Sequence, residues 1–123
     1  MSSILIVEDN EKNMKLVRDI LAHHGHRVIE ATTGEEGVRL ALSEAPDLIL
    51  MDIQLPDISG VEALARIRAS GASMPVLAVS ASVMPDEQQR IVSSGFDAFI
   101  AKPISLKPFL EAVKSALNAG RNQ

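Results

Sequence analysis

The sequence contains no cysteine, no tryptophan and no tyrosine, and it has only three phenylalanines. Without thiols, the chain cannot form disulfides, a cysteine-ligated zinc site or a cysteine nucleophile. No apolar run approaches the roughly 20 residues of a transmembrane helix. The first ten residues, MSSILIVEDN, have no basic region and include two acids, which argues against a secretory signal peptide. We therefore expect a soluble cytoplasmic protein with a largely aliphatic core.

Basic residues are outnumbered by acidic ones. The 123-residue chain has 12 Lys and Arg against 16 Asp and Glu, a net charge of −4, and 46% apolar residues. This charge argues against a nucleic-acid-binding face, which normally carries a basic excess, and no polybasic stretch suits an anionic membrane. The length and apolar content are those of one globular domain. We expect residues 1–123 to form a single domain with neither nucleic acid nor a membrane as partner.

Short apolar segments alternate with segments of helical periodicity along the whole chain. The predicted strands are 3–7, 27–31, 47–52, 75–80 and 97–101, and the predicted helices are 10–25, 33–45, 60–71, 85–95 and 106–120. Segments such as LILM and VLAV are continuously apolar, which is typical of parallel strands buried on both faces. Right-handed crossovers then predict a doubly wound, three-layer α/β sandwich. The pattern alone leaves the strand order open.

Polar residues interrupt the apolar pattern where the predicted strands end. Glu8 and Asp9 follow the first strand, Asp52 ends the third, Ser80 ends the fourth and Lys102 follows the fifth. In a parallel sheet these carboxyl ends share one edge, and open α/β sheets bind ligands at that edge. We therefore expect these side chains to meet there.

Each residue alone has a simpler interpretation. Asp9 or Asn10 could be a helix N-cap, Ser80 or Ser82 could cap the fourth helix, and Lys102 could be a solvated charge. Together, however, three crowded carboxylates repel one another unless a cation joins them, and their oxygens suit Mg²⁺. A nearby lysine and hydroxyl could contact a phosphoryl group, and a carboxylate can itself attack phosphorus. The pattern therefore indicates Mg²⁺-dependent aspartyl-phosphate chemistry.

Four stretches of the chain carry a more specific signal. They read ILIVEDNEKNMKLV, PDLILMDIQLPDISG, VLAVSAS and DAFIAKPIS, and they are distributed over essentially the whole sequence. In this order they resemble the receiver domain of two-component response regulators, and in particular the single-domain receivers of the DivK group. The resemblance implies a bacterial signalling protein with the flavodoxin-like (βα)5 fold, a five-stranded parallel sheet in the order 2-1-3-4-5, and no output domain.

The resemblance also implies a role for each polar residue. Asp52 would accept a phosphoryl group from a histidine kinase or a histidine phosphotransfer protein. Glu8, Asp9 and Asp52, with the backbone carbonyl of Gln54, would bind Mg²⁺, and Lys102 would pair with the phosphoryl oxygens. The chain would thus promote its own phosphorylation and slow dephosphorylation, as a signalling protein and not as an enzyme acting on other substrates.

A switch completes the implied mechanism. Ser80 would move to the phosphoryl group and Phe99 would turn inward, which changes the surface of the fourth helix, fifth strand and fifth helix for a downstream protein. Ser80 stands where the family more often has Thr, and Phe99 where it more often has Tyr. The Lys102–Pro103 pair matches the family's cis peptide. The resemblance also implies that Gln54 and Ser82 flank the site at positions that would tune dephosphorylation.

Other functions fit the sequence less well. An aspartyl phosphohydrolase wants a second acid two residues after the nucleophile, where this chain has Gln54, and a flavin carrier wants a glycine-containing loop in place of EDNEKN. A receiver that binds partners without phosphorylation would not need every chemical residue. A segment of a hybrid histidine kinase or a phosphorelay intermediate is the remaining alternative, which the initial Met makes less favoured. The histidines at 23, 24 and 26 lack the spacing of helical metal ligands and suit a helix C-terminus.

Overall fold

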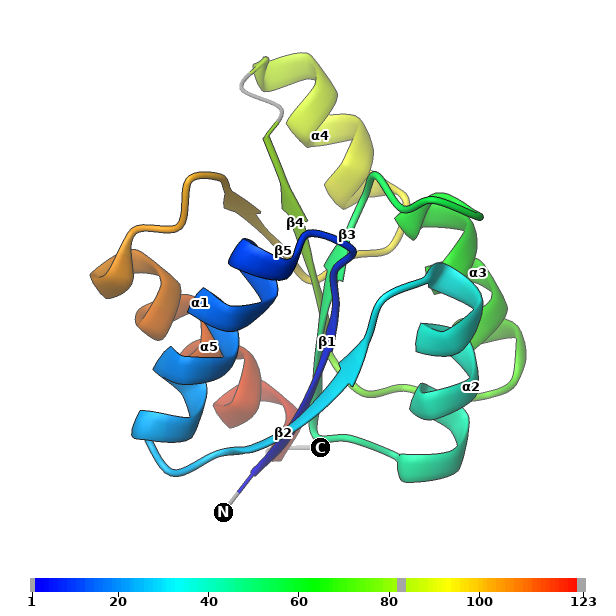
Figure 1. The fold of residues 1–123 in the computed structure, drawn as a ribbon. Helices are drawn as coiled ribbons and strands as arrows, with labels where there is room; N and C mark the ends of the chain where they lie inside the picture. The colour runs from blue at the N-terminus through cyan, green and yellow to red at the C-terminus, as the bar shows by residue number, and fades with distance from the viewer. Residues whose placement is uncertain (1, 82–83, 122–123) are drawn as a thin grey trace.

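Five parallel strands form one sheet, and five helices cover its two faces (Figure 1). The computed structural model describes residues 2–81 and 84–121. The elements are β1 (Ser3–Val7), α1 (Glu11–His23), β2 (Arg27–Ala31), α2 (Gly34–Glu44), β3 (Leu48–Asp52), α3 (Gly60–Ala69), β4 (Val76–Ser80), α4 (Pro85–Ser93), β5 (Ala98–Ala101) and α5 (Leu106–Arg121). The strand order is β2-β1-β3-β4-β5, which confirms the flavodoxin-like fold.

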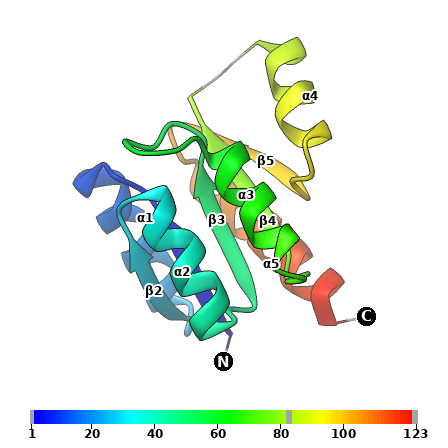
Figure 2. The same ribbon diagram turned by 90° about the vertical axis from the view of Figure 1, so that its right-hand side faces the viewer.

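The apolar runs are buried because helices cover both faces of the sheet. Figures 1 and 2 show α1 and α5 on one face and α2 and α3 on the other. Successive strand residues alternate between the layers: Ile4 and Ile6 pack with α1 and α5, whereas Leu5 and Val7 pack toward α2 and α3. Each large aliphatic side chain so buried contributes about 1.5–3 kcal/mol relative to exposure. Two apolar layers therefore hold the sheet from both sides.

Most helix ends lie within one or two residues of the predicted ones. The Asn10 side chain caps α1 by accepting a 3.0 Å hydrogen bond from the Asn13 N–H. This settles the choice between Asp9 and Asn10 as the N-cap. The helix ends at His23, before Gly25 reverses the chain with φ 84°.

Ser80 does not cap α4, so the simpler alternative interpretation of this residue does not hold. That residue ends β4, and the N-cap position of α4 is occupied by Met84, followed by Pro85 at the first helical position. Proline suits this position because it has no N–H to satisfy and its φ is already helical. Ser82 lies outside the described residues.

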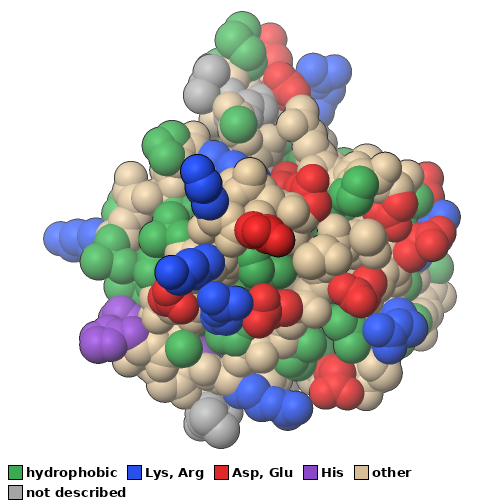
Figure 3. Space-filling view, in the orientation of Figure 1, with side chains coloured by type: hydrophobic (Ala, Val, Ile, Leu, Met, Phe, Trp, Pro, Cys, Tyr) green, Lys and Arg blue, Asp and Glu red, His purple; other side chains and the backbone are tan. Residues whose placement is uncertain are grey.

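The exposed surface carries charges of both signs. Figure 3 shows Lys and Arg side chains interspersed with Asp and Glu over the face that carries α1 and α2. Exposed ion pairs of the chain include Arg66 with Glu62 at 2.6 Å and Arg18 with Glu30 at 3.3 Å. Pairs of this kind contribute at most about 1 kcal/mol each. Among the described residues, no helix is long and apolar enough to cross a membrane.

Candidate functional site

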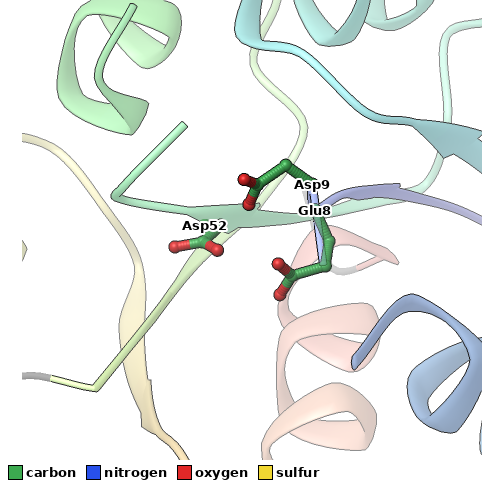
Figure 4. A group of neighbouring side chains, drawn as sticks. All are labelled: Glu8, Asp9 and Asp52. Carbon is green, nitrogen blue, oxygen red and sulfur yellow. The ribbon is translucent and has the colours of Figure 1, made fainter. Parts of the chain in front are cut away.

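The predicted cluster of polar side chains lies at the carboxyl ends of β1 and β3, which are neighbours in the sheet. One carboxylate oxygen from each of Glu8, Asp9 and Asp52 lies within 4.8 Å of the other two (Figure 4). Glu8 and Asp52 are each 4% exposed, and Asp9 is exposed. Strand order reverses between β1 and β3, because β1 connects outward to β2 and β3 connects the other way. The acids therefore meet at the topological switch point, where this fold binds ligands.

Lys102 reaches the acids from the end of β5, the edge strand two positions away from β3. It follows β5, and its Nζ lies 2.9 Å from Asp52 Oδ2 and 3.0 Å from Glu8 Oε1. The lysine side chain is 18% exposed, so this ammonium is shared between two carboxylates in a partly desolvated setting. Interactions between charges in such a setting are stronger than those at the open surface.

Burial and charge act against each other on these groups. Burial raises the pKa of Glu8 above its ordinary value, and Asp52 adds to the rise, while hydrogen bonds from Lys102 and the Asn10 N–H act in the opposite direction. Burial alone would lower the pKa of Lys102, but its hydrogen bonds to Asp52 and Glu8 and the charges of these two acids together outweigh burial and raise that pKa. Three carboxylates gather here and one lysine contacts two of them, so a further cation would offset the repulsion between the acids.

Asp52 is held by its surroundings on several sides. Its Oδ1 accepts a 3.0 Å hydrogen bond from the Gln54 N–H, while Lys102 donates to Oδ2. The next residue, Ile53, donates its N–H to the Val79 carbonyl of β4. Gly60 packs against the main chain of Asp52 so closely that a Cβ there would clash with the Asp52 carbonyl oxygen. The carboxylate therefore projects from a rigid strand end.

Ser80 and Phe99 lie on the β4–β5 side of the site. Ser80 is the last residue of β4 and is 5% exposed, and its carbonyl accepts a 2.9 Å hydrogen bond from the Lys102 N–H. Phe99 pairs in register with Ala78 and is half-buried against the apolar layer of α2 and α3. The Lys102–Pro103 peptide bond is cis. The switch roles of Ser80 and Phe99 stay predictions.

The histidines do not add a second metal centre in the described part of the chain, where the acidic triad is the group able to converge on an ion. His23 and His24 contact each other edge to face, with ring centroids 5.4 Å apart. His24 Nδ1 lies 2.9 Å from the Ile20 carbonyl at the end of α1. This arrangement is that of histidines at a helix C-terminus.

Two residues near the site were missed by sequence reasoning. Gly60 was interpreted only as the start of a helix, and its close approach to Asp52 becomes visible only in three dimensions. Asp57 hydrogen-bonds to the N-terminus of α2, more than 20 positions earlier in the chain. Aspartate is a capping residue type, but local spacing cannot reveal a cap supplied by another element.

A doubly wound sheet with a lysine-bridged acidic cluster at its switch point defines the class of receiver-like α/β proteins. Within that class, the model of the response regulator receiver domain matches residues 4–114. The chain therefore belongs to the response regulator receiver domain family.

The chain is similar to several known members of this family. It is 45% identical to the polar-differentiation response regulator DivK of Brucella anthropi, over 94% of this chain and 95% of that protein, and equally so to DivK of Brucella abortus. A CheY-like receiver domain protein from Methanospirillum hungatei is 30% identical, with a TM-score of 0.90 and coverage of 99% and 98%. These matches make the chain a DivK-like receiver and disfavour the phosphohydrolase and flavin-carrier alternatives.

A further solved relative bears on the metal. The receiver domain of a sensor histidine kinase from Pseudomonas aeruginosa is 29% identical, with a TM-score of 0.87 and coverage of 95% of this chain and 98% of that one. That structure has a magnesium ion coordinated in its active-site cleft. The three carboxylates of the present chain offer the hard oxygen ligands that Mg²⁺ prefers, so this donor set fits the same ion.

Proposed function

We propose that residues 1–123 act as one receiver domain that accepts a phosphoryl group on Asp52. The donor is a phosphohistidine of a histidine kinase or of a histidine phosphotransfer protein. One observation carries the proposal: the Asp52 carboxylate is buried, fixed by Gln54 and Lys102, and gathered with two further acids. Gathering three carboxylates is unfavourable because like charges repel, and such clusters are typical of functional sites. Phosphoryl transfer would account for this one.

The transfer would proceed by attack of an Asp52 oxygen on phosphorus. A P–O bond forms to Asp52, the P–N bond to the donor histidine breaks, and the electron pair and a proton end on the imidazole. Lys102, already within 3.0 Å of Asp52 and Glu8, neutralises charge on the equatorial oxygens. Glu8, Asp9, Asp52 and the Gln54 carbonyl would hold Mg²⁺, which supplies positive charge for the transferring group.

The consequence of phosphorylation would be a change of surface. A phosphoryl group adds about −1.5 to −2 of charge at neutral pH, and Ser80, the last residue of β4, would supply the hydroxyl that hydrogen-bonds it. Its movement would let Phe99 turn inward and alter α4, β5 and α5 for a downstream protein. In this proposal the charge at Asp52 biases a two-state element.

The test is incubation with acetyl phosphate and Mg²⁺, followed by intact mass. The wild-type chain gains one phosphoryl group, and Asp52→Asn gains none. Asp19→Asn, which changes an exposed acid of α1, serves as the matched control and labels like the wild type. Steady release of phosphate from generic phosphate esters, without a labelled protein, would indicate a phosphohydrolase instead.

A further inference from the structure

The loop between β3 and α3 is fastened to the start of α2. Asp57, in the middle of this loop, accepts a 2.8 Å hydrogen bond from the Gly34 N–H on Oδ1 and another of 2.8 Å from the Glu35 N–H on Oδ2. These N–H groups belong to the first turn of α2 and have no partner inside the helix. One carboxylate from a distant part of the chain therefore binds two of them at once.

An apolar contact lies beside this polar one. The Ile58 side chain packs so closely on Gly34 that a Cβ at that position would clash with it. The helix has a cap of its own as well, since Thr33 Oγ1 accepts a 3.1 Å hydrogen bond from the Glu36 N–H. The Asp57 contact is thus an addition to the local cap, and it joins two elements where Thr33 serves only one.

Both ends of the fastened loop lie at Asp52. At its start, the Gln54 N–H donates to Asp52 Oδ1, and the carbonyl of the same residue is the proposed fourth ligand of the cation. At its end, the Gly60 N–H donates a 2.9 Å hydrogen bond to the Ile53 carbonyl. A movement of the middle of the loop therefore reaches the backbone that orients the carboxylate.

Building on the proposed phosphoacceptor function, we infer that Asp57 is a positioning residue for the site. By clamping residues 53–59 onto α2, it fixes the backbone of Gln54, and so sets the affinity for the divalent cation and the rate at which Asp52 is phosphorylated.

The charge of Asp57 favours its contact with the N-terminus of α2, which we call the clamp. The backbone hydrogen bond from Glu35, together with those from Gly34, Ile58 and Asp57 itself, lowers the pKa of Asp57 from 3.8 to about 2, although desolvation opposes them. The carboxylate is therefore charged at every physiological pH, and the positive end of the α2 dipole favours that charge.

The test compares two variants that each remove one cap from the same helix. Asp57→Ala removes the clamp, whereas Thr33→Ala removes the local cap and leaves the loop contact in place. Mg²⁺ is titrated into each protein without phosphoryl donor, and the dissociation constant is read from backbone amide NMR shifts, because the chain has no Trp or Tyr for fluorescence. We expect Asp57→Ala to weaken Mg²⁺ binding about tenfold, the lower end for groups that orient metal ligands. Thr33→Ala should bind Mg²⁺ like the wild type.

Two further measurements keep the result decisive. Asp57→Asn retains one carbonyl acceptor and should bind Mg²⁺ with an intermediate dissociation constant, and it decides the matter if Asp57→Ala does not fold. The labelling rate with acetyl phosphate, measured at saturating Mg²⁺, should fall for Asp57→Ala and not for Thr33→Ala. Equal losses in the Asp57 and Thr33 variants would reduce Asp57 to a structural cap, and unchanged Mg²⁺ affinity in Asp57→Ala and Asp57→Asn would overturn the inference.

Failure of the inference differs from failure of the proposed function. If wild-type protein labels at Asp52 while the Asp57 variants bind Mg²⁺ normally, the function stands and the clamp is refuted. If the wild type never labels but Asp57→Ala weakens Mg²⁺ binding, the clamp positions a cation site and the phosphoacceptor proposal is refuted.

Discussion

The two sides of the site are built differently. On the β3 side, every residue of the strand is buried, Gly60 packs on the main chain of Asp52, and Asp57 ties the following loop to α2. On the β4–β5 side, α4 begins at Pro85, after an N-cap residue, Met84, whose side chain makes no capping hydrogen bond, and among the residues of α4 the buried one is Ile91. In Figure 2, α4 stands at the upper right of the molecule, above the other helices.

This difference suits two roles: the β3 side would hold Asp52 in place, and the β4–β5 side would change when Asp52 is phosphorylated. The side that carries Asp52 has close backbone packing and contacts between distant elements, which resist movement. α4 itself buries few apolar side chains, although β4 beside it is fully buried, so local opening of α4 costs less free energy. A charge placed at Asp52 would therefore shift α4 and β5 more readily than it would shift β3.

The largest expected effect concerns the groups that contact Asp52. Lys102→Ala removes the ammonium that contacts Asp52 and Glu8, so the labelling rate with acetyl phosphate should fall about 100-fold. Phe99→Leu, on the responding side, should leave that rate unchanged because Phe99 contacts none of the reacting groups in this account. Lys107→Ala, which removes an exposed lysine of α5, is the charge-matched control. Comparable losses from Phe99→Leu and Lys102→Ala would erase the distinction between the two sides.

A second prediction concerns the packing on Asp52. Gly60→Ala places a methyl group against the Asp52 carbonyl and should lower the free energy of unfolding by about 2 kcal/mol, as overpacking does. Gly71→Ala meets no neighbouring atom within 4 Å and should cost only the left-handed strain of its φ of 94°, about 1 kcal/mol. Urea unfolding followed by circular dichroism measures both. Equal stability of Gly60→Ala and wild type would show that the close approach is not required.

Some features of this molecule could be predicted from its sequence, namely those that depend on local patterns along the chain. The strands at 3–7 and 27–31 were predicted to the residue, because an apolar run bounded by polar residues marks a buried parallel strand. The meeting of Glu8, Asp9, Asp52 and Lys102 followed from one topological rule about strand ends. Both depend on patterns that recur along the chain.

The features that escaped prediction depend on contacts between elements. The binding of Asp57 to α2 requires the exact approach of a loop to a helix far away in sequence, and no periodicity encodes that approach. Ser80 offered two local interpretations, and the structure excludes the cap because Ser80 ends β4, whereas the N-cap position of α4 is Met84, four residues later. These features depend on how separate elements pack together, which cannot be predicted from the local pattern of a single sequence.

A third prediction compares the dynamics of the two sides. In native-state hydrogen exchange, amides of β3 should exchange only through near-global unfolding, whereas amides of α4 should exchange with opening free energies lower by about 2 kcal/mol or more. The buried pattern of β3 and the single buried side chain of α4 are the reasons. Equal protection of the two elements would contradict the proposed division between them.

The smallest effect is a pH dependence of the clamp. The folded-state pKa of Asp57 is about 2 and its ordinary value is 3.8, so the stability it contributes is fully present above pH 3.8 and is lost as the pH falls through about 2. The difference in free energy of unfolding between wild type and Asp57→Asn should therefore shrink over this range. Urea unfolding at a series of pH values measures it. A difference that stays constant down to pH 2 would argue against a charged clamp.

The central claim is that Asp52 itself carries the phosphoryl group, and chemical mapping tests it most directly. Protein treated with acetyl phosphate and Mg²⁺ is reduced with borohydride, which converts an acyl phosphate into an alcohol, and is then digested for peptide mass spectrometry. The account predicts the reduced side chain at position 52, and its loss when the cation is chelated before labelling. Reduction at a different carboxylate, or no reduced residue in protein that has taken up a phosphoryl group, would contradict it.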